Sequence, residues 1–387
     1  MVFVLSLLGL LTAGVLEQRR HLANLRSIPV RVLVNGIRGK SSITRLCAGA
    51  LRGGGLRVVA KTTGTAPRVI WPDGTETPVY RKFDTANVIE QTGIVRQAAA
   101  ERSDALVIEC MAVQPSLQEI SQTKLIQSTI GVLSNVRDDH LEEMGPELDD
   151  VARSLSRSMP EGGVCITAEW DRRHIFEAEA VRRGCRLVYA DPESVSDDEI
   201  AAFESFTFKE NVAIALAIAH ELGIGREEAL RGMWAAPPDP GVLTVQRYRI
   251  GGKSLRLANL FAANDPSSTV MTFERLLEGD AIRPPIFTLI NCRPDRVERN
   301  RQMGTIVERL LTEKLFVVGQ PARSATAAVP VGFAGAVTDL GGDHRDPGQI
   351  LRSIMREVED EASLVAVGNI HGQGERLLEH LEGLGAR

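Results

Sequence analysis

The chain has 387 residues, of which 43% are hydrophobic and 25% are charged, with a formal net charge of −5. This composition excludes a disordered chain, and the length favours two globular domains over one hydrophobic core. The negative charge argues against a nucleic-acid binder held by bulk electrostatics, so we expect no nucleic-acid partner. The five cysteines are scattered, without the spacing of a zinc site or disulfide framework, and predict a reducing, cytoplasmic compartment.

The N-terminus predicts a membrane anchor. Residues 1–16 carry no charge and are mostly Leu, Val and Phe, and Glu-Gln-Arg-Arg-His follows at positions 17–21. Basic residues beside an apolar segment are typical of the cytoplasmic side of a membrane helix. We therefore expect a single-pass anchor at 1–17, a polar connector at 22–27 and catalytic domains in the cytoplasm. The alternatives are a buried core helix and a cleaved signal peptide.

Strands and helices alternate after the connector. We expect strands at 30–35, 57–61, 105–109, 129–135, 163–167 and 186–189, with helices at 41–53, 88–101, 117–124, after Pro146, and at 211–222. This alternation predicts a mostly parallel, doubly wound sheet. Residues 235–241 contain three prolines and a glycine, which cannot continue a helix. We therefore place one domain at 28–236.

The strand pattern restarts beyond the prolines. Expected strands lie at 255–260, 286–291, 315–318, 336–338 and 364–367, separated by helical stretches. This restart predicts a second, smaller Rossmann-like α/β domain at 242–387.

A phosphate-binding loop follows the first expected strand. Residues 35–42 read Asn-Gly-Ile-Arg-Gly-Lys-Ser-Ser. Gly36 and Gly39 let backbone N–H groups approach an anion, and Lys40 adds a mobile charge at a positive helix N-terminus. Ser41 or Ser42 then offers a hydroxyl to Mg²⁺. Because Val34 stands where the full pattern has its first glycine, this is a variant of the P-loop.

Polar residues end other strands of the same expected sheet. Glu109 ends the strand 105–109, and Asn-Val-Arg-Asp-Asp-His follows another at 135–140. Ligands bind at the carboxyl ends of parallel strands, so Glu109 is placed to hold Mg²⁺. The alternatives are an exposed acid and, for His140, an ordinary surface histidine. We interpret Cys110 as a small buried residue rather than a nucleophile.

Two segments of the second domain carry polar clusters. Phe-Ala-Ala-Asn-Asp-Pro-Ser-Ser-Thr spans 261–269, and four arginines lie within 291–301. The guanidinium groups of Arg293 and Arg296 can each donate two parallel hydrogen bonds to a carboxylate or a phosphate. The alternatives are a capped turn and a solvated helix face.

Together these motifs resemble the Mur ligase superfamily of ATP-dependent amide ligases, which act in peptidoglycan and folate polyglutamate synthesis. The blocks are the loop at 35–42, Glu109, residues 135–140, Asn211 in its helix, and Asn264 with Asp265. Further blocks resemble the CapB/PgsB-type poly-γ-glutamate synthases: Lys-Thr-Thr-Gly-Thr at 61–65, Glu-Cys-Met-Ala-Val at 109–113, Asn-Cys-Arg-Pro-Asp-Arg at 291–296 and Gly-Asn-Ile-His-Gly at 368–372. The resemblance covers nearly the whole chain.

The resemblance implies an ATP- and Mg²⁺-dependent ligase that activates a glutamate carboxylate as an acyl phosphate for attack by the amine of the next glutamate. It makes Lys40, Glu109 and His140 catalytic, and Ser41, Glu109 and His140 metal ligands. The resemblance implies an ATP site formed by Asn35, Gly36, Arg38, Gly39, Lys40, Ser41, Ser42, Asn211, Asp265 and Arg293. It implies that the substrate is bound by Thr62, Thr63 and Arg296. The implied partners are glutamate, the growing poly-γ-glutamate chain and integral-membrane subunits; the oligomeric state stays open.

Two departures qualify these roles. The helix after the histidine block has no lysine that could be carbamylated, and Ser267 stands where several Mur ligases have a lysine. The first departure weakens the metal assignment of His140. The alternative functions are a folylpolyglutamate-type ligase and a non-catalytic ATP-binding scaffold of a membrane complex.

Overall fold

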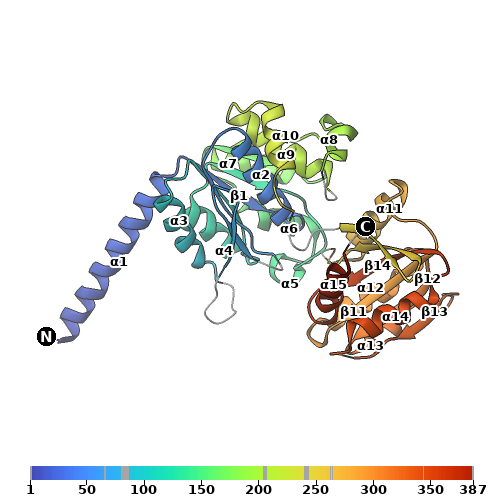
Figure 1. Ribbon diagram of the computed structural model, residues 1–387. Coiled ribbons are helices and arrows are strands. Elements are labelled where there is room, and N and C mark those ends of the chain that lie inside the picture. Colours follow the sequence, from blue (N-terminus) through green and yellow to red (C-terminus); the bar gives the residue numbers. More distant parts are fainter. Residues whose placement is uncertain are drawn as a thin grey trace. The chain divides into compact units, whose positions relative to one another are not determined.

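The computed structural model describes residues 2–64, 67–79, 87–203, 207–238, 244–261, 263, 265–342 and 344–385. The chain divides into two compact units, residues 1–240 and 241–387, and each has its own β-sheet (Figure 1).

The sheet of the first unit is parallel except at one edge. Its order is β4-β3-β2-β5-β1-β6-β7-β8; β3 pairs antiparallel with both β2 and β4, and the other pairs are parallel. The strands are β1 (Val30–Asn35), β2 (Val58–Lys61), β3 (Arg68–Ile70), β4 (Glu76–Pro78), β5 (Ala105–Glu109), β6 (Ile130–Leu133), β7 (Val164–Thr167) and β8 (Arg186–Tyr189). The expected α/β sheet is therefore present, with a short antiparallel hairpin that makes it mixed.

Helices cover both faces of this sheet. They are α1 (Val2–Arg26), α2 (Lys40–Gly53), α3 (Glu90–Ala100), α4 (Pro115–Ile120), the π-helix η1 (Ser121–Ile126), α5 (Leu141–Met144), α6 (Leu148–Ser156), α7 (Arg173–Arg183), the 3₁₀ turn η2 (Pro192–Ser194), α8 (Asp197–Ala201), α9 (Lys209–Glu221) and α10 (Arg226–Trp234). Figure 1 shows α9 and α10 gathered beside α2, and these three helices contact one another.

The alternation of side chains along β1 explains the two covered faces. Val32 and Val34 belong to the core cluster that includes α2, α9 and α10, whereas Leu33 belongs to the cluster that includes α3. Successive side chains of a strand point to opposite faces, so an entirely apolar strand is stable only when both faces are covered. The run Val-Leu-Val thus fixes β1 at the centre of the sheet.

The second unit is a smaller α/β layer structure. Its sheet has the order β13-β12-β11-β14-β10-β9, with β9 antiparallel to β10 and the other pairs parallel. The strands are β9 (Thr244–Ile250), β10 (Lys253–Asn259), β11 (Ile286–Cys292), β12 (Thr312–Gly319), β13 (Ala336–Asp339) and β14 (Glu361–Gly368). Its helices are α11 (Pro266–Glu278), the turn η3 (Pro294–Arg296), α12 (Val297–Thr305), α13 (Ala322–Thr326), α14 (Pro347–Glu357) and α15 (Gln373–Leu384).

The N-terminal helix corrects two expectations. It continues to Arg26, with Leu25 buried and Leu22 packed against the core, so no connector interrupts it at 22–27. None of the helices in the described part of the chain combines the length and apolar character that crossing a membrane requires. Residues 2–16 rise only about 22 Å as a helix, against a hydrocarbon core of about 30 Å. The predicted anchor at 1–17 is therefore not supported.

Candidate functional site

The loop between β1 and α2 is built to hold an anion. Gly39 precedes α2 with φ 75° and gives the helix no side-chain cap. Gly36 has φ 135°, and a Cβ there would lie 1.9 Å from the Ser134 hydroxyl oxygen. The uncapped first turn of α2 therefore presents backbone N–H donors at its positive end. The Lys40 ammonium donates to the Gly36 carbonyl at 2.7 Å, which places the positive charge over the loop.

The end of β6 fixes the shape of this loop. The Asn135 side chain accepts a hydrogen bond from the Arg38 N–H at 3.0 Å and donates to the Arg38 carbonyl at 3.1 Å. The Ser134 hydroxyl donates to the same carbonyl at 2.9 Å. Because both partners directly follow β6, which pairs with β1, the tertiary structure fixes the conformation of the loop.

Glu109 and Ser41 meet at the carboxyl edge of the sheet. The Ser41 hydroxyl donates to Glu109 Oε2 at 2.7 Å, and the Thr63 N–H donates to the same oxygen at 2.6 Å. Glu109 is only 3% exposed. The pairing of β5 with both β1 and β2 brings these three residues together from distant parts of the sequence.

The Ser41–Glu109 pair fits a magnesium site. A carboxylate oxygen beside a hydroxyl oxygen is the hard donor set that Mg²⁺ prefers, and the cation usually keeps several waters. A buried carboxylate also gains from a cation, because an unpaired buried charge is costly. These two residues would hold the metal next to the phosphate loop.

Two predicted site residues are occupied elsewhere. The Asn35 amide donates to Gln118 Oε1 at 2.8 Å and to the Ser158 hydroxyl at 2.9 Å, inside the protein. Thr62 is fully buried, and its hydroxyl accepts the Arg68 N–H at 3.2 Å. Both side chains are engaged in local structure, and their roles in ATP and substrate binding stay predictions.

Asn211 and Ser42 lie at the loop as the sequence predicts. Asn211 is on α9, and its amide atoms are 3.5 Å from the position of a Cβ on Gly39. Ser42 is half-buried in the first turn of α2. A side-chain amide beside the loop glycine can contact a bound nucleotide, and that role stays a prediction.

His140 occupies a left-handed turn beside the loop. Its φ is 55°, and it immediately precedes α5. Its ring nitrogens lie 3.7 Å from Asp139 Oδ2 and 3.8 Å from Glu143 Oε2, while Asp139 also pairs with Arg38 at 2.9 Å. Within the described ranges, no three His, Cys, Asp or Glu side chains form a group that could hold a metal. The metal role of His140 therefore stays a prediction.

The predicted residues of the second unit lie at the ends of its strands. Asp265 caps α11, and its carboxylate accepts the Ser268 N–H at 2.8 Å. Arg293 forms two hydrogen bonds with Asp295, at 2.9 and 2.8 Å, and Arg296 is exposed. Asn264 lies outside the described residues. The capped turn that we weighed for this segment is thus present, and nucleotide contacts by Asp265 and Arg293 stay predictions.

The structure adds three residues that we did not assign to the site. The Gln91 amide donates to the Glu109 carbonyl at 3.3 Å. Lys61, at the end of β2, is fully buried and forms an ion pair with Glu90. The sequence signal for Lys61 is a lysine at the carboxyl end of an apolar strand, whereas nothing local distinguishes Gln91 and Glu90 from the other residues of α3.

The cysteines take no part in this site. All five are free and buried. Burial raises the pKa of the Cys110 thiol to about 11, which keeps it protonated and non-nucleophilic at neutral pH. The structure thus supports the interpretation of Cys110 as a packed residue.

Comparison with known sequences identifies the family. Residues 34–223 match the Mur ligase middle domain, and residues 245–384 match the poly-gamma-glutamate synthase CapB C-terminal domain. The chain is 38% identical to the capsule biosynthesis protein CapB of Bacillus anthracis, over 98% of this chain and 82% of that one. It is 35% identical to the PGA synthase CapB of Bacillus subtilis (strain 168), over 98% and 97%.

Solved structures agree on the fold. Escherichia coli FolC in complex with ADP superposes with a TM-score of 0.70 at 15% identity, covering 94% of this chain and 92% of that one. The folylpolyglutamate synthase/dihydrofolate synthase of Yersinia pestis complexed with AMPPNP and Mn ion also gives 0.70, at 14% identity and with 94% and 91% covered. From the sequence matches, the chain belongs to the CapB family of poly-γ-glutamate synthases, within the Mur ligase superfamily.

Proposed function

We propose that this protein is an ATP-dependent amide ligase that lengthens poly-γ-glutamate. The observation that carries the proposal is the arrangement of Ser41, Glu109 and Thr63 beside a loop with an uncapped helix N-terminus and Lys40. Family membership supplies the substrate class, because the relatives are described as a capsule biosynthesis protein and a PGA synthase.

The proposed reaction has two steps. The terminal carboxylate of the glutamate chain attacks the γ-phosphorus of ATP, which forms an acyl phosphate and releases ADP. The amine of the next glutamate then attacks the acyl carbon, so a C–N bond forms, the C–O bond to phosphate breaks, and phosphate and a proton leave. Such phosphoryl transfer depends mainly on positioning and charge neutralisation, which the residues of the loop can supply.

Each residue has a defined proposed role. The backbone N–H groups of residues 39–41 and the Lys40 ammonium would bind the β- and γ-phosphates. Ser41 and Glu109 would hold Mg²⁺, which neutralises phosphate charge when bound. The Thr63 N–H keeps Glu109 oriented through its 2.6 Å hydrogen bond, and the Thr63 side chain stays a predicted substrate contact, together with Arg296.

Location and partners are finer parts of the proposal. The five free, buried cysteines support catalytic domains in a reducing, cytoplasmic compartment. Apolar side chains on α1, such as Phe3 at 92% and Leu10 at 73% exposure, support a protein partner, because large exposed apolar surfaces commonly mark interaction sites. Co-purification of integral-membrane subunits with the full chain, lost after replacement of those side chains, would test this part.

The central test is glutamate-dependent ADP release by the full chain with ATP, Mg²⁺, glutamate and a poly-γ-glutamate primer. Lys40→Ala should lower the rate by roughly 10²–10³-fold, while the exposed-lysine control Lys124→Ala keeps it. Circular dichroism and thermal unfolding would show that both variants are folded. Equal rates for Lys40→Ala and the wild type would contradict the phosphate role of the loop.

Two further results would select the alternative functions. Hydroxylamine should trap the acyl phosphate as a hydroxamate; ATP binding without hydroxamate would indicate a scaffold. ADP release that depends on a folate rather than on glutamate polymer would indicate a folylpolyglutamate-type ligase, the function named for the Yersinia pestis structure with this fold.

A further inference from the structure

Lys61 is a charged residue inside the protein. It ends β2, is fully buried, and forms an ion pair at 2.5 Å with Glu90, whose side chain is 18% exposed. Its ammonium group also lies 3.7 Å from the sulfur of Met111. Lysine is almost never fully buried unless it is paired, and replacing a buried ion pair by apolar side chains is often neutral or stabilising. Stability alone therefore does not account for the Lys61–Glu90 pair.

The pair lies on the opposite face of the sheet from Ser41. Lys61 is in register with Ile108, which belongs to the core cluster that includes α3. Successive side chains of a strand point to opposite faces, so the side chain of Glu109 points to the α2 face, where the Ser41 hydroxyl donates to it. The ammonium group is thus held on the α3 face, and the Glu109 carboxylate lies on the other.

Both members of the pair are close in the chain to a residue that contacts Glu109. Thr63, two residues after Lys61, donates its N–H to Glu109 Oε2 at 2.6 Å. Gln91, which follows Glu90, is buried and donates its side-chain amide to the Glu109 carbonyl at 3.3 Å. The ion pair therefore joins the segment that contacts the Glu109 carboxylate to the segment that contacts its backbone.

The two ends of this connection are anchored in regular structure. Lys61 belongs to a strand that pairs on both sides, with β3 and with β5. Glu90 is in the first turn of α3, where the positive end of the helix dipole favours a carboxylate. Contacts one step away from a metal-binding side chain orient that side chain, and their removal typically weakens metal binding roughly 10–100-fold.

We propose that Lys61 and Glu90 are positioning residues for the Glu109 carboxylate. They act through the Thr63 N–H and the Gln91 amide, and keep the carboxylate oriented toward a Mg²⁺ ion without touching ATP or the cation themselves. The inference rests on the proposed function, because it explains how the metal site of that reaction is held in shape.

Isothermal titration of the full chain with AMPPNP, with and without Mg²⁺, tests the proposal. The quantity compared is the factor by which Mg²⁺ strengthens AMPPNP binding. The variant Lys61→Met/Glu90→Gln removes both charges, so no unpaired buried charge remains. We expect it to lower this factor by about tenfold or more, while binding without Mg²⁺ stays as in the wild type. A general loss of structure would instead weaken binding under both conditions.

Two single variants keep the test decisive if the ion-pair variant does not fold. Gln91→Met removes the hydrogen bond to the Glu109 carbonyl without changing any charge, so it should also lower the Mg²⁺ factor. Lys61→Arg keeps a cation opposite Glu90 and should keep the factor close to that of the wild type.

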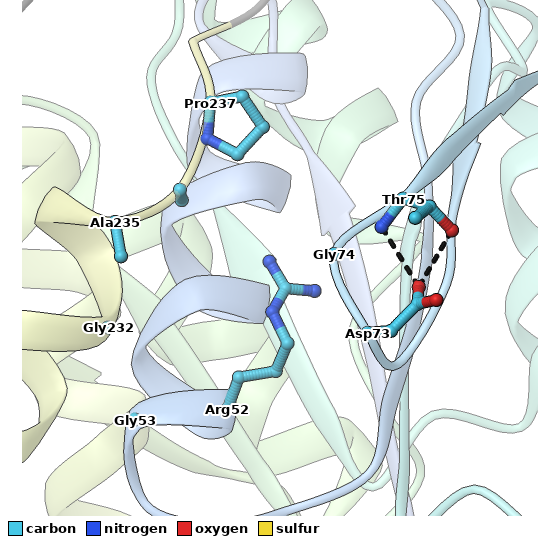
Figure 2. Close-up of a pocket in the computed structure, with 9 residues that line it drawn as sticks. Arg52, Gly53, Asp73, Gly74, Thr75, Gly232, Ala235 and Pro237 are labelled. Atoms are coloured by element: carbon cyan, nitrogen blue, oxygen red, sulfur yellow. Dashed lines mark hydrogen bonds between the residues drawn. The ribbon is translucent and has the colours of Figure 1, made fainter.

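Two control variants alter contacts that do not involve Glu109. Arg183 and Glu179 of α7 form an ion pair of similar burial, with side chains 2% and 16% exposed, and Arg183→Met/Glu179→Gln should keep the wild-type factor. Figure 2 shows the turn between β3 and β4, which lines a pocket; there the Asp73 carboxylate accepts hydrogen bonds from the Thr75 hydroxyl at 2.7 Å and N–H at 2.9 Å. Asp73→Ala removes both bonds and should likewise keep the factor.

Two variants of the proposed site separate this inference from the proposed function. Lys40→Ala should weaken AMPPNP binding under both conditions, and Glu109→Gln should lower the Mg²⁺ factor. An unchanged factor in Glu109→Gln would show that the proposed metal site itself is wrong. A lowered factor in Glu109→Gln, with an unchanged factor in both Lys61→Met/Glu90→Gln and Gln91→Met, would overturn the positioning role alone. Because the titration needs no turnover, absence of ligase activity would not affect it.

Discussion

Glu109 illustrates how much depends on a single residue. It ends an apolar strand, and the structure gives it two donors, the Ser41 hydroxyl and the Thr63 N–H. The first contact brings together the two residues to which the sequence analysis assigned magnesium, a role that stays a prediction, while the second could not be read from spacing. A donor that lies 46 positions away in the sequence reaches Glu109 only because β2 and β5 are neighbours.

Replacement of this carboxylate should remove activity with little effect on the fold. We expect Glu109→Gln to lower glutamate-dependent ADP release by about 10²-fold or more, because the amide keeps the size of the side chain but loses the charge that holds a cation. Isothermal titration of Mg²⁺ with ATP present would show weaker metal binding. Glu101→Gln, on an exposed turn, is the matched control; equal loss in both variants would contradict a specific role.

Thiol reactivity gives a prediction with a definite dependence on pH. Burial raises the pKa of Cys110 and Cys185 to about 11 and of Cys292 to about 12, so at pH 8 the thiols stay protonated and unreactive. We expect iodoacetamide to label the native protein very slowly at pH 8, and faster as the pH approaches 11. Mass spectrometry would count the labels, with urea-unfolded protein as the fully labelled reference. Rapid labelling of Cys110 in the native state would contradict this prediction.

At the scale of elements, the packing of α2 on α10 depends on glycine. A Cβ on Gly49 would lie 2.6 Å from the Gly232 carbonyl oxygen, and one on Gly232 would lie 2.1 Å from the Gly49 carbonyl oxygen. Both distances are too short for a side chain, so these two helices approach backbone to backbone. Since α2 carries the phosphate loop at its other end, this contact also supports the site.

A pair of glycine substitutions tests this packing. Gly232→Ala should lower the free energy of unfolding by about 1–3 kcal/mol, because the backbone must shift to admit the methyl group. Gly93→Ala, within α3, meets nothing within 4 Å and should raise it by about 0.5–1 kcal/mol, since alanine has the higher helix propensity. Urea unfolding of both variants would measure the difference, and destabilisation by Gly93→Ala would refute the reasoning.

The strands that the sequence missed are at the edges of the sheets, and the helices α7 and α8 were also not predicted. The bounds expected for β1, β5 and β8 agree with the structure, because these strands are apolar runs or sit between clear turns. The hairpin β3–β4 was missed since its strands have only three residues each. The antiparallel pairing of β9 with β10 had a sequence signal that we did not use, the adjacent glycines Gly251 and Gly252. Both have positive φ in the structure, as the tight turn between the two strands requires.

At the scale of the whole molecule, each unit contains its own hydrophobic core. Leu257, Leu289 and Leu364 belong to a cluster made entirely of residues after 247, while the clusters around β1 contain only residues before 235. A unit with a complete core can fold alone. The phosphate loop and the Ser41–Glu109 pair both belong to the first unit.

The second unit should therefore fold as a fragment. We expect residues 241–387, expressed alone, to unfold cooperatively on heating and to show native-like circular dichroism. Residues 1–240 should retain nucleotide binding that Lys40→Ala removes, but should not release ADP in response to glutamate if Asp265 or Arg293 is needed. A fragment 241–387 without cooperative unfolding would show that its core depends on the rest of the chain.

The sequence by itself determined the alternation of strands and helices, the phosphate loop and the family resemblance, because these depend on local periodicity and on residues adjacent in the chain. Only the tertiary structure decided that Glu109 meets Ser41 and Thr63, that Asn35 and Thr62 are held in local hydrogen bonds, and that α1 extends to Arg26. The physical reason is that strand pairing and helix packing join residues that the sequence separates, and no local pattern records which partners they acquire.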